Sequence, residues 1–198
     1  MNTAKVILTG AALSVFSVLA HAVPISADFR LEADLPDLSD SGAKVYEALD
    51  QEVTSGYELT GDSFLENPSD WLGGEVWMNL DPTTYQLKFN SQDNLDFQIM
   101  EAWVTNIQFD ASEMISGVSL VSNDLTDPLV SPEWSFTSNS LYFSFDASPG
   151  FFDFTGGDAV FQIETRQASA AVPEPGTLSL FALGLLMLVV ARSRRQGV

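Results

Sequence analysis

Apolar and polar residues alternate along much of the chain, with the two-residue period of a strand that buries one face. Four stretches show the alternation clearly: 29–35, 85–89, 141–145 and 161–163. Three more are strand candidates: 103–110, 114–122 and 132–138. Short breaks rich in Ser, Asn, Asp, Gly or Pro separate them. Many short strands at this spacing favour an antiparallel sandwich or barrel.

One pair of runs has the signature of a hairpin. The segment Asp81-Pro82-Thr83-Thr84 lies between two strand-like runs, and its proline presets the backbone for a tight turn. We therefore expect a hairpin here. For residues 23–166 as a whole we expect an all-β fold, an antiparallel β-sandwich of jelly-roll-like type, with an N-terminal signal helix and a C-terminal transmembrane helix on either side.

The stretch from residue 43 to residue 51 is ambiguous. As a short helix starting near Ser41, it would place Val45, Leu49 and Val53 roughly along one face. It could equally be a strand leading into 56–60. The β character of the surrounding sequence favours the strand.

The N-terminus has the three parts of a secretory signal. Lys5 precedes an uncharged apolar stretch from Val6 to Ala20, and small residues stand at Ala20 and Ala22, the two positions that a signal peptidase inspects. Because the apolar stretch is short for a stable membrane span, we expect cleavage after Ala22. The expected partners at this end are the secretion machinery and signal peptidase.

Charge and composition exclude several functions for the exported part. Residues 23–172 hold 26 of the 27 acidic residues and four basic ones, so their formal charge is 4 − 26 = −22. Such a surface repels nucleic acid, and no nucleic-acid partner is expected. The chain has no cysteine, and its one histidine, His21, is lost with the signal. Ser-His-Asp and Cys-His mechanisms and zinc or copper sites are therefore excluded, which predicts a protein that is not an enzyme.

No cofactor is expected apart from calcium, which prefers carboxylate and carbonyl oxygens in loops. Two acidic loops supply the candidates: Asn123, Asp124 and Asp127 in one, and Asp153 and Asp158 in the other. Neither loop matches an EF-hand, and both could equally be ordinary turns on an acidic surface.

The four tryptophans raise a different possibility, a stacking platform for sugar rings. Bulky aromatic residues also fill the core of a sandwich that lacks disulfides, and this is the more frequent use. Trp103 shares the alternating face of Ile107, which favours a place in the core for both. Trp71 stands in a loop-like segment and is the candidate ligand residue; Trp77 and Trp134 carry no such signal.

The C-terminal tail consists of an extended motif, an apolar run and a basic end. Pro173-Glu174-Pro175 holds the chain extended, the run from Thr177 to Ala191 is a short span of about 22 Å as a helix, and three arginines follow it: Arg192, Arg194 and Arg195. By the positive-inside tendency the arginines stay cytoplasmic, which leaves the acidic domain outside. Residues 167–172 form a small, polar spacer ahead of the motif.

In order and spacing, this tail, residues 173–198, resembles the PEP-CTERM sorting signal of Gram-negative bacteria. Its motif is at 172–175, beginning one residue before the tail, its helix is at 177–191 and its basic end is at 192–195. The resemblance implies that Val172, Pro173, Glu174 and Pro175 are recognised by an exosortase, which removes the tail at or near them. It also implies export across the inner membrane, a transient membrane anchor, and then the cell surface or the extracellular space.

These observations lead to an expected function. The chain is an exported protein sorted through its tail, and a non-enzymatic structural component of an extracellular matrix associated with exopolysaccharide or biofilm. The alternative is a carbohydrate-binding module that recognises the exopolysaccharide itself, and a third possibility is a glycosidase with paired carboxylates. Three or more exposed aromatics in line on one sheet face would favour binding, and burial of all four tryptophans would favour the structural role.

Overall fold

The computed structural model describes residues 23–36, 42–68, 75–92, 98–110, 112–126, 130–150 and 155–168. The predicted signal peptide, with Ala20 and Ala22, and the predicted sorting tail lie outside these ranges. The signal helix and the transmembrane helix therefore stay predictions. Within the described ranges, no helix is long and apolar enough to cross a membrane.

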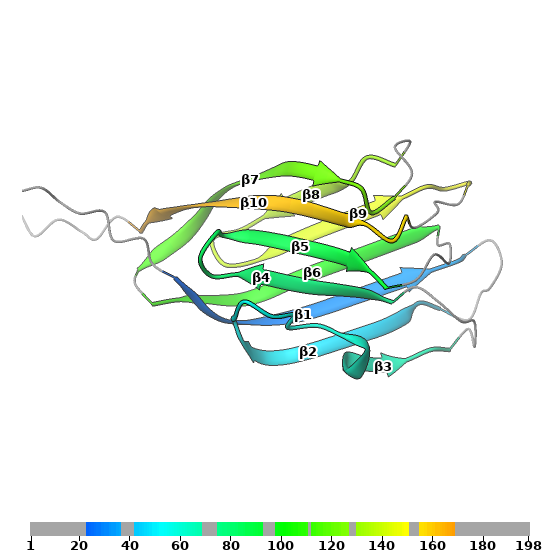
Figure 1. Cartoon of the computed structure of the whole chain (residues 1–198), viewed down its shortest axis with the longest axis horizontal. Helices are drawn as coiled ribbons and strands as arrows, with labels where there is room; N and C mark the ends of the chain where they lie inside the picture. Colours follow the sequence, from blue (N-terminus) through cyan, green and yellow to red (C-terminus); the bar gives the residue numbers. More distant parts are fainter. Residues whose placement is uncertain are drawn as a thin grey trace, which may run out of the picture.

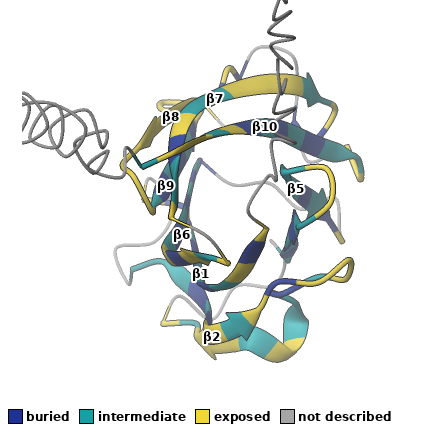
Figure 2. Ribbon diagram, turned by 90° about the vertical axis from the view of Figure 1, so that its left-hand side faces the viewer, coloured by how far each residue is buried: buried dark blue, intermediate teal, exposed yellow. Residues whose placement is uncertain are grey.

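The described chain forms two antiparallel sheets, as the sequence predicts (Figures 1 and 2). The strands are β1 (Pro24–Asp34), β2 (Lys44–Glu52), β3 (Phe64–Glu66), β4 (Val76–Asp81), β5 (Gln86–Ser91), β6 (Ile99–Phe109), β7 (Glu113–Asn123), β8 (Glu133–Phe136), β9 (Leu141–Asp146) and β10 (Asp158–Gln167), with one 3-10 turn, η1 (Gly61–Ser63), before β3. Sheet A has the order β3-β2-β1-β6-β9-β8, and sheet B has the order β4-β5-β10-β7.

A cluster of phenylalanines joins the two sheets. Phe89 of β5 contacts Phe143 and Phe145 of β9 edge-on, with ring centroids 5.2 and 5.9 Å apart, and it contacts Phe161 of β10 at 5.8 Å. All four rings are fully buried. Figure 2 shows buried positions along the strands of both sheets. The core thus relies on aromatic packing in a chain without disulfides.

The alternation predicts the inner faces of the main strands correctly. The alternating residues of 29–35, 141–145 and 161–163 are buried, and the ambiguous 43–51 region is strand β2. The hairpin between β4 and β5 is confirmed, since the Tyr85 N–H donates to the Asp81 carbonyl at 2.9 Å. Tyr85 itself departs from the alternation: its backbone is left-handed (φ 58°) and its side chain is only partly buried. β10 extends to Gln167, one residue into the predicted spacer.

Asp28 of β1 links the two strands that flank it, β2 and β6. Beside Asp28, each of these strands has one residue more than β1. The registers of β1 against β2 and against β6 both shift around Asp28. Its carboxylate accepts the backbone N–H of Asp50 on β2 at 2.7 Å and the side-chain amide of Asn106 on β6 at 2.5 Å. Both partners have left-handed backbones, with φ 51° and 52°. Asp28 therefore supports two β-bulges at once.

Candidate functional site

The structure brings the two candidate calcium loops together. Several of their oxygens, however, already accept hydrogen bonds or form an ion pair within the protein. The Asp124 N–H donates to the Asp158 carbonyl at 2.7 Å, and the Thr155 hydroxyl donates to the Asp124 carbonyl. The Asp158 carboxylate pairs with Lys88 at 2.7 Å and accepts from Asn90 at 2.5 Å. The bond to Asp158 raises the pKa of Lys88, which therefore stays charged.

The side chain of Asn123 turns toward its own loop. Its amide donates to the Thr126 hydroxyl and to the Val130 carbonyl, each at 3.3 Å. Asp127 and Asp153 lie outside the described residues. No group of three acidic or other ligand-type side chains in the described ranges could hold a metal ion. Contacts within the fold thus engage the Asp158 carboxylate and the Asn123 amide nitrogen, whereas the buried Oδ1 of Asn123 has no hydrogen-bond partner among the described residues.

One carboxyl group is buried away from these loops. Glu58 accepts the N–H of Thr54 at 2.9 Å with one oxygen and the N–H of Leu80 at 2.9 Å with the other. Burial raises the pKa of Glu58 above the ordinary glutamate value, although the two N–H donors oppose the shift. Because both oxygens are taken by backbone, Glu58 fastens the segment before η1 to β4.

The tryptophans in the described ranges lie in three different environments. Trp77, on the outer face of sheet B, meets Tyr57 edge-on at 5.3 Å and donates its indole N–H to Glu75 at 2.5 Å. Trp134 is 37% exposed at the edge of sheet A, where it contacts Phe161 and donates to the Val118 carbonyl of β7 at 3.2 Å. Trp71, the candidate ligand residue, lies outside the described residues.

Trp103 is not in the core, so the expectation for it was wrong. It stands half-buried on the outer face of sheet A, while Ala102 and Val104 face inward and Ile107 is buried as expected. The left-handed residue Asn106 inserts an extra position between Trp103 and Ile107. A one-residue bulge reverses the inside–outside alternation, so two positions of equal parity in the sequence lie on opposite faces.

Trp103 and Tyr142 lie side by side on adjacent strands, in register on β6 and β9. Their ring centroids are 5.5 Å apart, and the rings are tilted by 44°. They line a hollow of about 190 Å³, here called the aromatic hollow, together with six further residues: Thr105, Ser135, Phe136, Thr137, Ser140 and Leu141. The Tyr142 hydroxyl donates to Glu101, and this bond raises the pKa of the phenol.

A second hollow follows the aromatic hollow along β8 and β9. This polar hollow has a volume of about 250 Å³ and is lined by Ser131, Glu133, Ser144, Asp146 and Ser148. In the β8–β9 register, Ser135 lies opposite Tyr142 and Glu133 lies opposite Ser144. The two hollows therefore succeed one another on the outer face of the same hairpin. The sequence did not indicate this site, although Tyr142 is an outward position of a clearly alternating strand.

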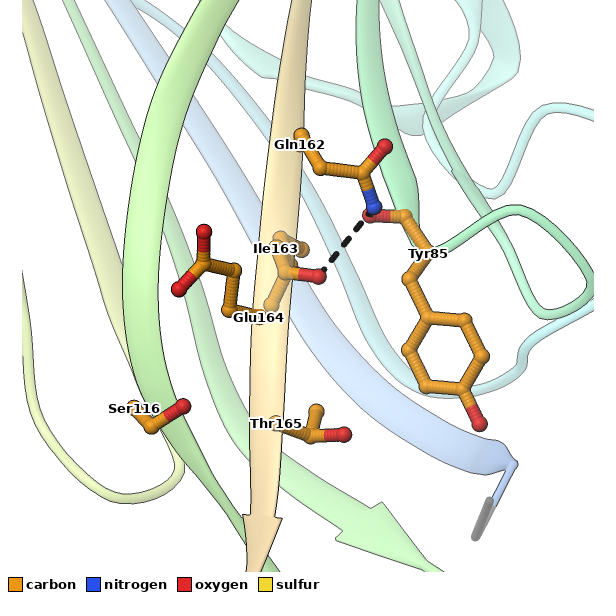
Figure 3. A pocket seen from close by; sticks show the side chains of 6 residues that line it. All are labelled: Tyr85, Ser116, Gln162, Ile163, Glu164 and Thr165. Carbon is orange, nitrogen blue, oxygen red and sulfur yellow. Dashed lines mark hydrogen bonds between the residues drawn. The ribbon is translucent and has the colours of Figure 1, made fainter. Parts of the chain in front are cut away.

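A third hollow, of about 380 Å³, lies on sheet B near the start of β5 (Figure 3). Gln162 lines this hollow, and its side-chain amide donates to the carbonyls of Thr84, Tyr85 and Ile163 at 3.0 to 3.3 Å. Glu164 lies over Gly117, where an added Cβ would come within 2.7 Å of its carboxylate. The Gln162 amide of this hollow therefore holds the β4–β5 turn against β10 rather than facing a ligand.

Residues 171–195 match the family model of the PEP-CTERM protein-sorting motif, which confirms the resemblance expected from the sequence. The motif indicates an exported protein that an exosortase processes and that is sorted toward the cell envelope or surface. No curated protein and no solved structure matches the chain. The motif therefore indicates how the protein is transported and sorted, and it does not extend to the sandwich.

Proposed function

We propose that this protein is exported, loses its tail to an exosortase, and then serves as a non-enzymatic structural component of an extracellular, polysaccharide-rich matrix. The match of residues 171–195 to the PEP-CTERM sorting motif carries the proposal. In this account the producing cell is Gram-negative, and the run from Thr177 to Ala191 anchors the chain in the inner membrane only until the tail is removed.

The surface of the sandwich supports a role in a hydrated gel. Cations on the described surface are few, and two of them are already neutralised. Arg30 pairs with Glu32 at 2.6 Å and with Glu47 at 2.9 Å, and Lys88 pairs with Asp158. Most carboxylates of the described residues are thus at least partly exposed and form no ion pair with these two cations. Such a surface binds water and counterions, and divalent cations such as Ca²⁺ can bridge it to other acidic chains.

The second candidate function is a carbohydrate-binding module, and the aromatic hollow favours it. Neither criterion from the sequence is met among the described tryptophans. They are not all buried, and Trp103 and Tyr142 are two aromatics on one outer face rather than three in line. The two roles are compatible, because a matrix protein can hold the polymer around it.

Fractionation of producing cells tests the proposal. Wild type should be found in the extracellular matrix and be released by a calcium chelator. A variant with Pro173, Glu174 and Pro175 all changed to Ala should stay with the membrane. A control with Gln167→Ala and Ser169→Ala, just before the motif, should behave as wild type. Wild-type protein confined to the membrane, or a matrix whose amount and cohesion do not change when the protein is removed, would overturn the proposal.

A further inference from the structure

We propose that the aromatic hollow and the polar hollow together bind a neutral, linear polysaccharide, with a sugar ring placed against Trp103. The inference rests on the proposed location of the protein in a matrix, and it names the class of partner that the protein meets there. It is carried by the placement of Trp103 and Tyr142 and by the groups around them.

The aromatic pair offers the platform that a sugar ring needs. A sugar presents an apolar C–H face and a rim of hydroxyls, and binding sites for such molecules combine aromatic surface with a few placed polar groups. Trp103 and Tyr142 are both partly exposed in the hollow. Within the part of the chain that the structure describes, the indole N–H of Trp103 has no hydrogen-bond partner, unlike that of Trp77. It is therefore available to a ligand.

Side-chain hydroxyls surround this platform, and the backbone holds them in place. Thr137 and Ser140 share a hydrogen bond of 2.6 Å across the β8–β9 turn. The tip of that turn is fastened to two other strands: the Ile107 N–H of β6 donates to Asn139 at 3.0 Å, and the Ile115 N–H of β7 donates to Ser138 at 2.9 Å. A rim fixed before binding loses little conformational freedom when a ligand arrives.

The length of the surface suits a chain rather than a single sugar. From Tyr142 in the aromatic hollow to Asp146 in the polar hollow, β9 advances four residues, or about 13 Å at the usual rise of a strand. Ser144, Glu133 and Asp146 add hydroxyl and carboxylate oxygens along this path. These groups accept hydrogen bonds from sugar hydroxyls, so one polymer can contact both hollows.

Charge selects against anionic polymers. Among the described residues, no lysine or arginine lines either hollow, whereas Glu133 and Asp146 line one of them and Glu101 accepts the hydrogen bond of the Tyr142 hydroxyl. Arg30 lies beside Trp103 in the β1–β6 register, but Glu32 and Glu47 balance its charge. A uronic-acid or sulfated polymer would be repelled, and a neutral one would not.

Calorimetric titration and tryptophan fluorescence of the mature protein, purified from the cell surface, test the inference. The probes are the neutral hexasaccharides cellohexaose, xylohexaose, mannohexaose and maltohexaose, with an alginate hexasaccharide as the anionic probe. We expect at least one neutral probe to bind, and alginate to bind at least about tenfold more weakly. Trp103→Ala and Tyr142→Ala should each weaken binding of that neutral probe by about tenfold or more.

Trp77→Ala is the matched control, because Trp77 is also half-buried on an outer sheet face beside a tyrosine. It should leave affinity within about twofold of wild type. Trp103→Phe keeps a ring and should cost only a few-fold in affinity, so it provides a result if Trp103→Ala does not fold. The inference is overturned if no neutral probe binds below about 5 mM, if alginate binds as tightly, or if Trp77→Ala weakens binding as much as Trp103→Ala. Each of these results would leave export and tail processing untouched, since those are measured separately.

Discussion

Replacing Asp28 by alanine should destabilise sheet A at its centre. The carboxylate accepts one hydrogen bond from the Asp50 backbone and one from the Asn106 side chain, and both donors belong to left-handed residues. A hydrogen bond to a charged group contributes about 1.5–3 kcal/mol when buried, and less here because both donors are solvent-exposed. At about 1 kcal/mol each, Asp28→Ala should cost about 2 kcal/mol of unfolding free energy.

Two variants of Asn106 separate the loss of its hydrogen bond to Asp28 from the cost of its left-handed backbone. Asn106→Gly removes the bond to Asp28 but tolerates φ 52°, so it should cost about 1 kcal/mol. Asn106→Ala also removes the bond and must hold a left-handed backbone, so it should cost about 1 kcal/mol more than the glycine variant. Asp28→Ala combined with Asn106→Gly should cost less than the sum of the two single changes, because they remove one shared bond.

Urea unfolding of the mature protein, followed by tryptophan fluorescence, measures these differences. The matched control is Asp34→Ala on the same strand, because the Asp34 carboxylate accepts the neighbouring Leu35 N–H at 2.8 Å and lies outside the bulges. If Asp28→Ala destabilises no more than Asp34→Ala, or if the effects of Asp28→Ala and Asn106→Gly add fully, the shared support of two bulges is refuted.

Two further predictions concern the core and the buried carboxyl. Phe89→Ala should cost about 3–5 kcal/mol, because it opens a cavity among Phe143, Phe145 and Phe161, and a loss below about 1 kcal/mol in urea unfolding would contradict the packing described. Glu58 should make stability depend on pH, because its folded pKa is raised above 4.5. Its contribution is complete below the unfolded pKa and is lost as pH rises through the folded pKa. Since Glu58→Gln cannot titrate, the stability of wild type relative to this variant should fall as the pH rises above 4.5 through the raised folded pKa, and a difference that is constant or rises would contradict the assignment.

Local pattern predicted much of this structure, since most features of the sheets repeat every two residues. The inner faces of β1, β9 and β10 follow directly from alternation. The bulges do not, because one left-handed residue such as Asn106 leaves no trace in hydropathy and yet reverses every later position on its strand. That single event explains why Trp103 was expected inside.

The candidate site depends on contacts between segments far apart in the sequence. Trp103 and Tyr142 become neighbours only through the β6–β9 register, and the turn at Ser138 and Asn139 is fixed by β6 and β7. Strand pairing over such distances cannot be worked out from one sequence. The sorting tail is the opposite case: motif, apolar run and basic end are contiguous, so the sequence alone indicated it and the family match at 171–195 confirmed it.

The central claim is that the tail is a sorting signal that is cleaved off before the protein reaches the cell surface. The intact mass of the surface-associated protein tests this claim most directly. The account predicts a wild-type chain that begins at Val23 and ends near Pro175, with any glycan visible as added mass. It also predicts that changing Pro173, Glu174 and Pro175 to Ala leaves a full-tailed chain in the membrane. A wild-type protein that keeps its sequence through Val198 would contradict the account and would make the apolar run a permanent anchor.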